Sequence, residues 1–184
     1  MKKIPSCLEG YLLVAKPSLG DPNFRRSIVF MAHHQEDGAL GFVVNRPLDK
    51  TVADVLKSSI TIPEIFHKIP LLLGGPVTME KLSIVVFQET PKTKAIRVKL
   101  GVPPDELENY VDQPSTWVRG FCGYSGWHGG QLEREIEEGA WEIRKPDRHI
   151  FDPRFIRGLW IFLIRNDNRW RLFVDAMPRS FSEN

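Results

Sequence analysis

The chain has 184 residues, of which 42% are hydrophobic and 26% are charged, and its formal net charge at pH 7 is +2. This composition excludes an intrinsically disordered protein, and the length suits one domain with one substantial hydrophobic core. We therefore expect a single domain over residues 1–184.

The first third of the chain is typical of strands separated by turns and followed by a helix. Three apolar stretches rich in β-branched and aromatic residues lie between segments with turn composition. The second and third are apolar at nearly every position, which indicates strands covered on both faces. A threonine of the N-cap type and apolar residues at helical spacing then predict a helix. The expected strands span 10–15, 27–32 and 39–45, and the expected helix spans 51–59.

The remainder alternates further strands with helices. Two glycines and a proline at 74–76 predict an abrupt turn. A glycine-rich stretch, 123–130, is expected as a loop that leads straight into a helix. The expected strands span 70–77, 81–88, 95–100, 117–123 and 140–144, and the expected helices span 103–113, 131–139 and 152–167.

The sequence shows no segment that we expect to direct export or to enter a membrane. The apolar stretch after the basic start, residues 11–15, is shorter than the roughly 7–15 residues of a signal-peptide core. The strongest apolar run near the other end, 158–164, falls short of the ~20 residues of a membrane span. Cys7 and Cys122 exclude a disulfide framework and are expected as reduced thiols. We expect a cytoplasmic protein with no membrane partner.

The glycine-rich stretch, GYSGWHGG, is a candidate for a catalytic or an anion-binding loop. GYSG resembles part of a nucleophile elbow, but Trp127 stands where the G-x-S-x-G pattern needs glycine. The stretch is neither a phosphate loop nor a dinucleotide fingerprint. Free backbone N–H groups before a helix bind anions in other proteins. The structural alternative is a tight turn that Tyr124 and Trp127 anchor in the core.

Two further groups of polar residues follow apolar strands. His33 and His34 lie beside acidic residues, but neighbours on a strand point to opposite faces, so we expect a solvated turn rather than a metal site. Asn45 and Arg46 end the third strand, where Arg46 suits either an anion clamp or a carboxylate pair. His128 lies within the glycine-rich stretch, and no spacing in the sequence supplies it with an acid–base partner.

Several motifs in order make the chain resemble the YqgE/AlgH family of bacterial proteins. PSLGDPNF, RSIVF and GALGFVVNRP occur in the N-terminal part, and LLLGGPV follows. GYSGWHGGQLE is similar to that family's G-Y-A-G-W-x-x-G-Q-L-E pattern. The resemblance covers most of residues 10–141, and it leaves 148–184 as a divergent C-terminal portion.

The resemblance implies an α+β fold, in which a mixed, bifurcated β-sheet curls into a pseudo-barrel with a few helices packed outside. It implies a cytosolic protein without an established biochemical activity, and AlgH itself bears the label of a transcriptional regulator. It implies no nucleophile, because Ser125 stands where the family usually has alanine. We find no helix-turn-helix in the sequence.

The leading hypothesis is a regulatory or binding protein in which the motif segments form one surface cleft for a protein or small-molecule partner. We expect no catalytic residue, no metal and no cofactor. The candidate ligand-binding residues are Asp21, Asn45, Arg46, Gly75, Gly123, Tyr124, Gly126, Trp127, Gly130, Gln131 and Glu133.

Two alternatives belong to other classes of protein. Residues 105–142 carry nine acidic and two basic side chains, whereas 144–184 carry nine basic and five acidic ones. That asymmetry permits nucleic-acid binding by the C-terminal portion, although a dedicated binder has a clustered basic stripe. The other alternative is an enzyme of unknown reaction that uses the glycine-rich cleft, with Arg46 and Glu133 as its polar groups.

Overall fold

The computed structural model describes residues 5–56 and 62–165. The strands in these ranges are β1 (Leu12–Ala15), β2 (Ile28–Gln35), β3 (Gly38–Val43), β4 (Pro47–Thr51), β5 (Pro70–Leu73), β6 (Val77–Glu89), β7 (Ile96–Leu100), β8 (Thr116–His128) and β9 (Trp141–Arg144). The α-helices are α1 (Gln131–Glu137) and α2 (Leu159–Ile164), and the 3₁₀-helices are η1 (Ala53–Val55), η2 (Glu64–Lys68), η3 (Pro104–Asn109) and η4 (Arg148–Phe151). No helix of these ranges is long and apolar enough to cross a membrane.

The strands form one mixed sheet in which β8 belongs to two parts. The first part of β8 lies between β5, to which it is parallel, and β6, to which it is antiparallel. Its last residues leave these neighbours and pair with β3, from Gly41 opposite Ser125 to Gly38 opposite His128. From β3 the sheet continues through β2 and β1 to β9. The sheet therefore divides along β8.

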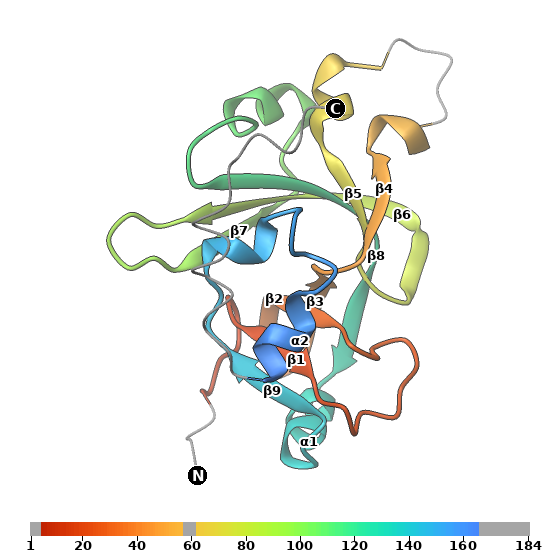
Figure 1. The fold of residues 1–184 in the computed structure, drawn as a ribbon, viewed down its shortest axis with the longest axis vertical. Coiled ribbons are helices and arrows are strands. Elements are labelled where there is room, and N and C mark those ends of the chain that lie inside the picture. Colours follow the sequence, from red (N-terminus) through yellow and green to blue (C-terminus); the bar gives the residue numbers. More distant parts are fainter. Residues whose placement is uncertain (1–4, 57–61, 166–184) are drawn as a thin grey trace.

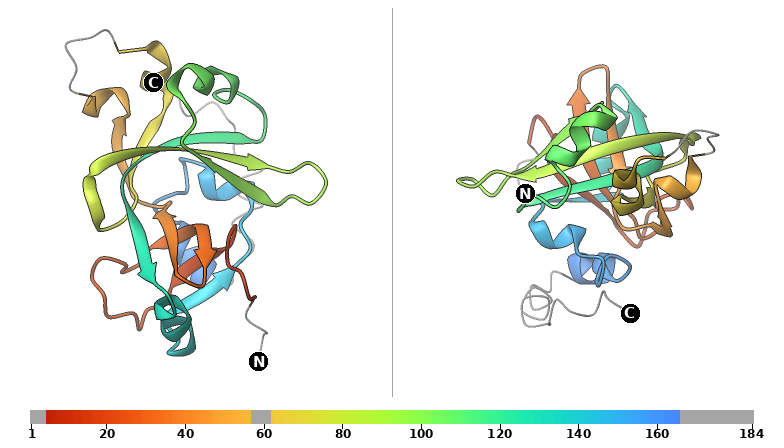
Figure 2. Two further views of the ribbon diagram at one scale, coloured as in Figure 1. Left: turned by 180° about the vertical axis from the view of Figure 1, so that it is seen from behind. Right: turned by 90° about the horizontal axis from the view of Figure 1, so that it is seen from above.

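Figure 1 shows how this division curls the sheet. β6 and β8 cross the molecule, β1, β2 and β9 lie below them, and α1 follows the lower end of β8. The views from behind and from above in Figure 2 show the helices outside the curled sheet. The expected α+β fold with a mixed, bifurcated and curled sheet is confirmed, and the expected pseudo-barrel has the form of a half-barrel.

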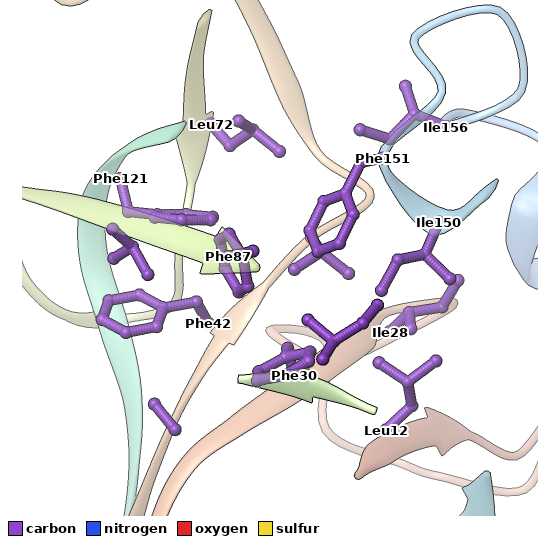
Figure 3. Packing of buried hydrophobic residues seen from close by; sticks show 14 of the residues in the cluster. Leu12, Ile28, Phe30, Phe42, Leu72, Phe87, Phe121, Ile150, Phe151 and Ile156 are labelled. Atoms are coloured by element: carbon purple, nitrogen blue, oxygen red, sulfur yellow. The ribbon is translucent and has the colours of Figure 1, made fainter. Parts of the chain in front are cut away.

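Phenylalanine rings fill the core between the two parts of the sheet. In Figure 3, Phe30, Phe87, Phe121 and Phe151 approach one another from different elements. The centroid of the Phe87 ring lies 5.1 Å from that of Phe30, 6.2 Å from that of Phe121 and 4.7 Å from that of Phe151. Because these rings come from β6, β2, β8 and η4, their burial holds the half-barrel together.

Strand β2 is covered on both faces, as its apolar sequence predicts. Ile28, Phe30 and Ala32 belong to the phenylalanine core, whereas Val29 and Met31 belong to a second cluster that includes Leu132 of α1. A third cluster packs η1, η2 and η3 against β5, β6 and β8. Each face of the sheet thus has its own apolar cover.

The predicted loop at 123–130 is wrong over most of its length. Six of these residues, Gly123 to His128, continue β8. Tyr124 still pairs with Val77 of β6, and Ser125 to His128 pair with β3. The missed strand β4 precedes the position where we expected a helix at 51–59. There the Asp54 carboxylate accepts a hydrogen bond from the Thr51 backbone N–H at 2.6 Å, and the described helical turn is limited to η1. Residues 57–61 of that prediction lie outside the described residues.

Two other predicted helices are shorter than expected. The segment 103–113 forms only η3, in which Leu107 is the single buried residue, so one apolar anchor supports it. In 152–167, α2 begins after Gly158, and the last two residues of the prediction lie outside the described residues. The predicted strand 81–88 begins earlier, at Val77, since the turn at 74–76 leads directly into β6.

We predict that Phe87→Ala lowers the free energy of unfolding by about 3–5 kcal/mol, because the ring is fully buried among three others. Met79→Ala on the same strand is the matched control. Its side chain is 55% exposed, so we expect a change below about 0.5 kcal/mol. Urea denaturation of both variants measures the difference, and equal midpoints would contradict the role of Phe87.

Candidate functional site

Asn45 fastens the end of β3 to the start of β2. Its Oδ1 accepts a hydrogen bond from the backbone N–H of Ile28 at 2.8 Å, and its Nδ2 donates to the backbone oxygen of Arg26 at 2.9 Å. The side chain is buried, so both bonds are made away from most of the solvent. Asn45 therefore satisfies two backbone groups that a strand partner does not reach.

The Arg46 side chain holds the loop between β1 and β2 by hydrogen bonds to the backbone of that loop. Its guanidinium donates to the backbone oxygens of Asn23, at 2.7 Å, and Arg25, at 3.0 Å. Burial lowers the pKa of Arg46 below its usual value, while the Asp21 carboxylate acts in the opposite direction. The Asp21 carboxylate itself accepts a hydrogen bond from the Asn23 N–H at 2.8 Å. Carbonyl oxygens, not the predicted carboxylate partner, receive these two bonds.

Close backbone packing explains the glycines of the turn at 74–76, which lies against the start of the predicted loop. A Cβ on Gly74 would lie 2.3 Å from the Gly123 oxygen, and a Cβ on Gly75 would lie 2.3 Å from the Tyr124 oxygen. The hydroxyl of Ser125 is buried and donates to the Gly74 oxygen at 3.1 Å. The serine that resembles a nucleophile is therefore part of the packing between β8 and the turn at 74–76.

A buried aromatic cluster surrounds one carboxylate of α1. Trp127 stacks on Phe24 with ring centroids 5.8 Å apart, and Trp141 packs edge-on against both rings. The indole N–H groups of Trp127 and Trp141 both donate to Oε2 of Glu135, at 2.9 and 2.8 Å. Gln131 donates to the other oxygen, Oε1, at 2.9 Å. Glu135 thus links α1 to β8 and β9.

Sequence reasoning missed Glu135 because it is one of several glutamates on a short helix. A signal was available, since Glu135 lies one helical turn after Gln131, and buried tryptophans usually find a hydrogen-bond partner. Gln131 was predicted for ligand contact. Its Oε1 accepts from the His128 backbone N–H at 3.2 Å, so this side chain also completes the turn into α1.

His34 contradicts the predicted solvated turn. It lies in β2, and its side chain is only 7% exposed. Its Nδ1 accepts a hydrogen bond from the Leu8 N–H at 3.1 Å, so the neutral ring carries its proton on Nε2, which donates to Oε1 of Glu133 at 2.8 Å. The alternation of a strand places His33 on the other, exposed face.

The structure brings segments of the motifs PSLGDPNF, NRP, GGPV and GYSGW into contact, but in separate pairs. Phe24 of the first segment meets Trp127 of the glycine stretch, and Arg46 holds the loop that carries Phe24. The backbone oxygen of Gly74 accepts a hydrogen bond from the Ser125 hydroxyl. Arg46 and Glu133, proposed as polar groups of one site, have different partners. These side chains bond to or pack against one another and the backbone around them. Ligand binding by them stays a prediction.

Arg119 is a buried cation that the sequence analysis did not single out. Its guanidinium donates to the backbone oxygens of Val118 and Phe151, each at 2.9 Å, and lies over the ring of Phe151. Burial lowers the pKa of Arg119 to about 10. The side chain remains charged at neutral pH and connects β8 to η4.

A cavity of about 660 Å³ lies away from all these residues. It opens between β7 with the hairpin before it, the segment that leads into β1, and the residues that follow β9. Figure 1 shows these segments on one side of the molecule. The candidate residues do not line this cavity. Its wall includes Glu9, Tyr11, Lys94, Ile96, Arg97 and Lys145.

The AlgH-like family model matches residues 12–177. The chain belongs to the AlgH-like family. Among its AlgH-like relatives, UPF0301 protein SPO0296 of Ruegeria pomeroyi is 34% identical over 95% of this chain and 97% of its own length. UPF0301 protein SCO2948 of Streptomyces coelicolor is also 34% identical, over 97% of this chain and 96% of its own.

Solved structures agree with the AlgH-like assignment. The solution structure of AlgH from Pseudomonas aeruginosa, PA0405, has a TM-score of 0.67 and 26% identity, and covers 97% of this chain and 98% of that one. Protein DIP2367 of Corynebacterium diphtheriae has a TM-score of 0.68 at 23% identity, with 90% of each chain covered, and shows the same fold. The family resemblance read from the motifs is therefore confirmed.

We predict that Glu135→Ala lowers the free energy of unfolding by about 1–3 kcal/mol, because it leaves two indole N–H groups without their acceptor. Tryptophan fluorescence should also shift to longer wavelength as water reaches Trp127 and Trp141. Glu137→Ala, on an exposed position of the same helix, is the control and should leave both properties nearly unchanged. Two variants of equal stability would show that the carboxylate is dispensable.

Proposed function

We propose that this AlgH-like protein is a cytosolic, non-catalytic binding protein that takes an anionic ligand in the cavity beside β7. The observation that carries the proposal is the composition of the cavity wall. Three cationic side chains, Lys94, Arg97 and Lys145, line it together with one carboxylate, Glu9. A concave site with excess positive charge attracts and retains anions.

The charge of this wall is incompletely neutralised within the described part of the chain. Lys94 lies 3.6 Å from a carboxylate oxygen of Glu89, which is a loose ion pair. Arg97 and Lys145 have no carboxylate within ion-pair distance among the described residues. Tyr11 adds aromatic surface on which the uncharged part of a ligand can pack. The cavity therefore suits an anion with an apolar portion.

A non-catalytic role agrees with the contacts of the residues that first suggested chemistry. The hydroxyl of Ser125 is buried and already donates its proton to a carbonyl oxygen. His34 and Glu133 bond to each other, but the ring also accepts from a backbone N–H, which fixes its tautomer and leaves it no free nitrogen. Neither the Ser125 hydroxyl nor the His34–Glu133 pair is placed to activate a substrate.

Nucleic-acid binding by the C-terminal portion is the alternative function, and it would agree with the transcriptional-regulator label that AlgH bears. Three of the basic residues described there face carboxylates: Arg144 pairs with Glu142, Arg154 with Asp152, and Arg157 with Asp49. Pairing of this kind leaves fewer cations for phosphate groups. A steep loss of affinity for duplex DNA with rising salt would favour this alternative, and no affinity at low salt would exclude it.

We predict that inorganic pyrophosphate and glutarate shift the backbone amide signals of the cavity residues Tyr11, Ala95 and Val98 in ¹H–¹⁵N spectra. Small anions make few contacts, so we expect dissociation constants in the millimolar range. The double variant Arg97→Gln, Lys145→Gln should lose these shifts, whereas Lys50→Gln, an exposed lysine on β4, should keep them. Unshifted cavity signals with both probes, or equal shifts in the double variant, would refute the proposal.

A further inference from the structure

One edge of β7 has no strand partner in the described ranges. β7 pairs with β6 from Ile96 opposite Glu89 to Leu100 opposite Val85, and its other edge borders the cavity. An unpaired edge presents backbone N–H and C=O groups that can add a further strand. Only the groups that point away from β6 can pair with such a strand.

The hydrogen bonds at the start of the hairpin settle the direction. The Thr90 N–H donates to the Ala95 oxygen at 2.8 Å, so the Ala95 C=O group points toward β6. Bonded and non-bonded pairs alternate along an antiparallel ladder, so the N–H and C=O groups of Ile96, Val98 and Leu100 point away from β6. The position of Gly10 agrees with this direction, because a Cβ there would lie 3.5 Å from the Ile96 oxygen. Gly10 covers that oxygen and Ile96 is only 3% exposed, so the accessible outward groups are those of Val98 and Leu100.

The opposite wall of the cavity offers no comparable edge. The Gly10 N–H donates to the Met31 oxygen at 2.8 Å, and the Tyr11 oxygen accepts from the Met31 N–H at 2.9 Å. Pro146 has no N–H to donate. A chain that enters the cavity therefore finds a strand edge at β7, while Tyr11 and Pro146 contact its side chains.

The side chains of β7 select the charge of that chain. Ile96 and Val98 face the phenylalanine core, so Arg97 and Lys99 lie on the opposite face of the strand. A second copy of β7 would bring the same cations against them, which destabilises strand pairing. A strand with alternating apolar and acidic residues complements both faces at once.

We propose that the ligand is an extended acidic peptide segment of a partner protein, which adds a strand to the free edge of β7. This inference rests on the proposed function and names the ligand of the same cavity. Backbone hydrogen bonds to Val98 and Leu100, which are accessible, supply affinity, and Arg97, Lys94 and Lys145 select acidic side chains. Binding of this kind is salt-dependent, because part of its strength comes from exposed charges.

The test uses short, end-blocked peptides that alternate valine and glutamate, with the full-length protein. Two N-methylated versions are compared, one methylated at the valines and the other at the glutamates. Successive N–H groups of a strand point to opposite edges, so one version blocks pairing with β7 and the other does not. We expect one version to bind about tenfold more weakly than the unmodified peptide, and the other to bind about equally well.

Charge is tested in the same assay. A peptide with lysine in place of glutamate should not bind. Arg97→Glu should weaken binding of the acidic peptide, whereas Lys50→Glu should leave that binding unchanged. Equal binding of both methylated peptides would overturn the inference, as would retained binding of the lysine peptide. A protein that sediments as a dimer and dissociates with Arg97→Glu would assign the edge to a second copy and would also overturn it.

The outcomes separate this inference from the proposed function. If pyrophosphate shifts the cavity signals and the acidic peptide does not bind, the cavity takes anions but not a strand, and only the inference is wrong. If neither probe affects cavity residues, both are wrong. Selective loss of binding with one methylated peptide supports both.

Discussion

The fold depends on contact between two stretches of backbone with no side chain between them. The turn at 74–76 lies against β8 at Gly123 and Tyr124, so closely that a Cβ on either glycine of the turn would overlap the main chain. Gly123 has φ 71°, a conformation that glycine adopts at little cost. At this point β8 leaves β5 and β6 and turns toward β3. Without this approach the two parts of the sheet would not enclose one core.

Local patterns predicted the strands that bury apolar residues on both faces. The run at 27–32 was placed correctly from Ile28 onward, because each residue from Ile28 to Ala32 belongs to one of the two clusters. β4 was missed since Leu48, Asp49 and Lys50 are exposed and carry no apolar alternation. The continuation of β8 to His128 depends on pairing with Gly38–Gly41, about 90 residues earlier in the chain, and single-segment periodicity contains no information on such pairing. The curled, bifurcated sheet was available only from the family resemblance.

The sequence placed Asn45 and Arg46 at the end of a strand but did not identify their partners. Both side chains bond to backbone groups, whereas an anion or a carboxylate was expected for Arg46. Glu135 was not distinguishable from its neighbours, because its role arises only when Trp127 and Trp141 converge on it in three dimensions. The cavity beside β7 involves three segments distant in sequence, and neither composition nor motif connects them.

The contacts of Arg46 have a consequence for how the loop between β1 and β2 can evolve. Both of its acceptors are carbonyl oxygens, which every amino acid possesses. The tether therefore constrains the path of the loop and leaves the identities at Asn23 and Arg25 unconstrained by this contact. Only Phe24, between them, is tied to its neighbours by its ring. Such a loop can present varied side chains at these two surface positions while its shape stays constant, much as an antibody framework holds a hypervariable segment.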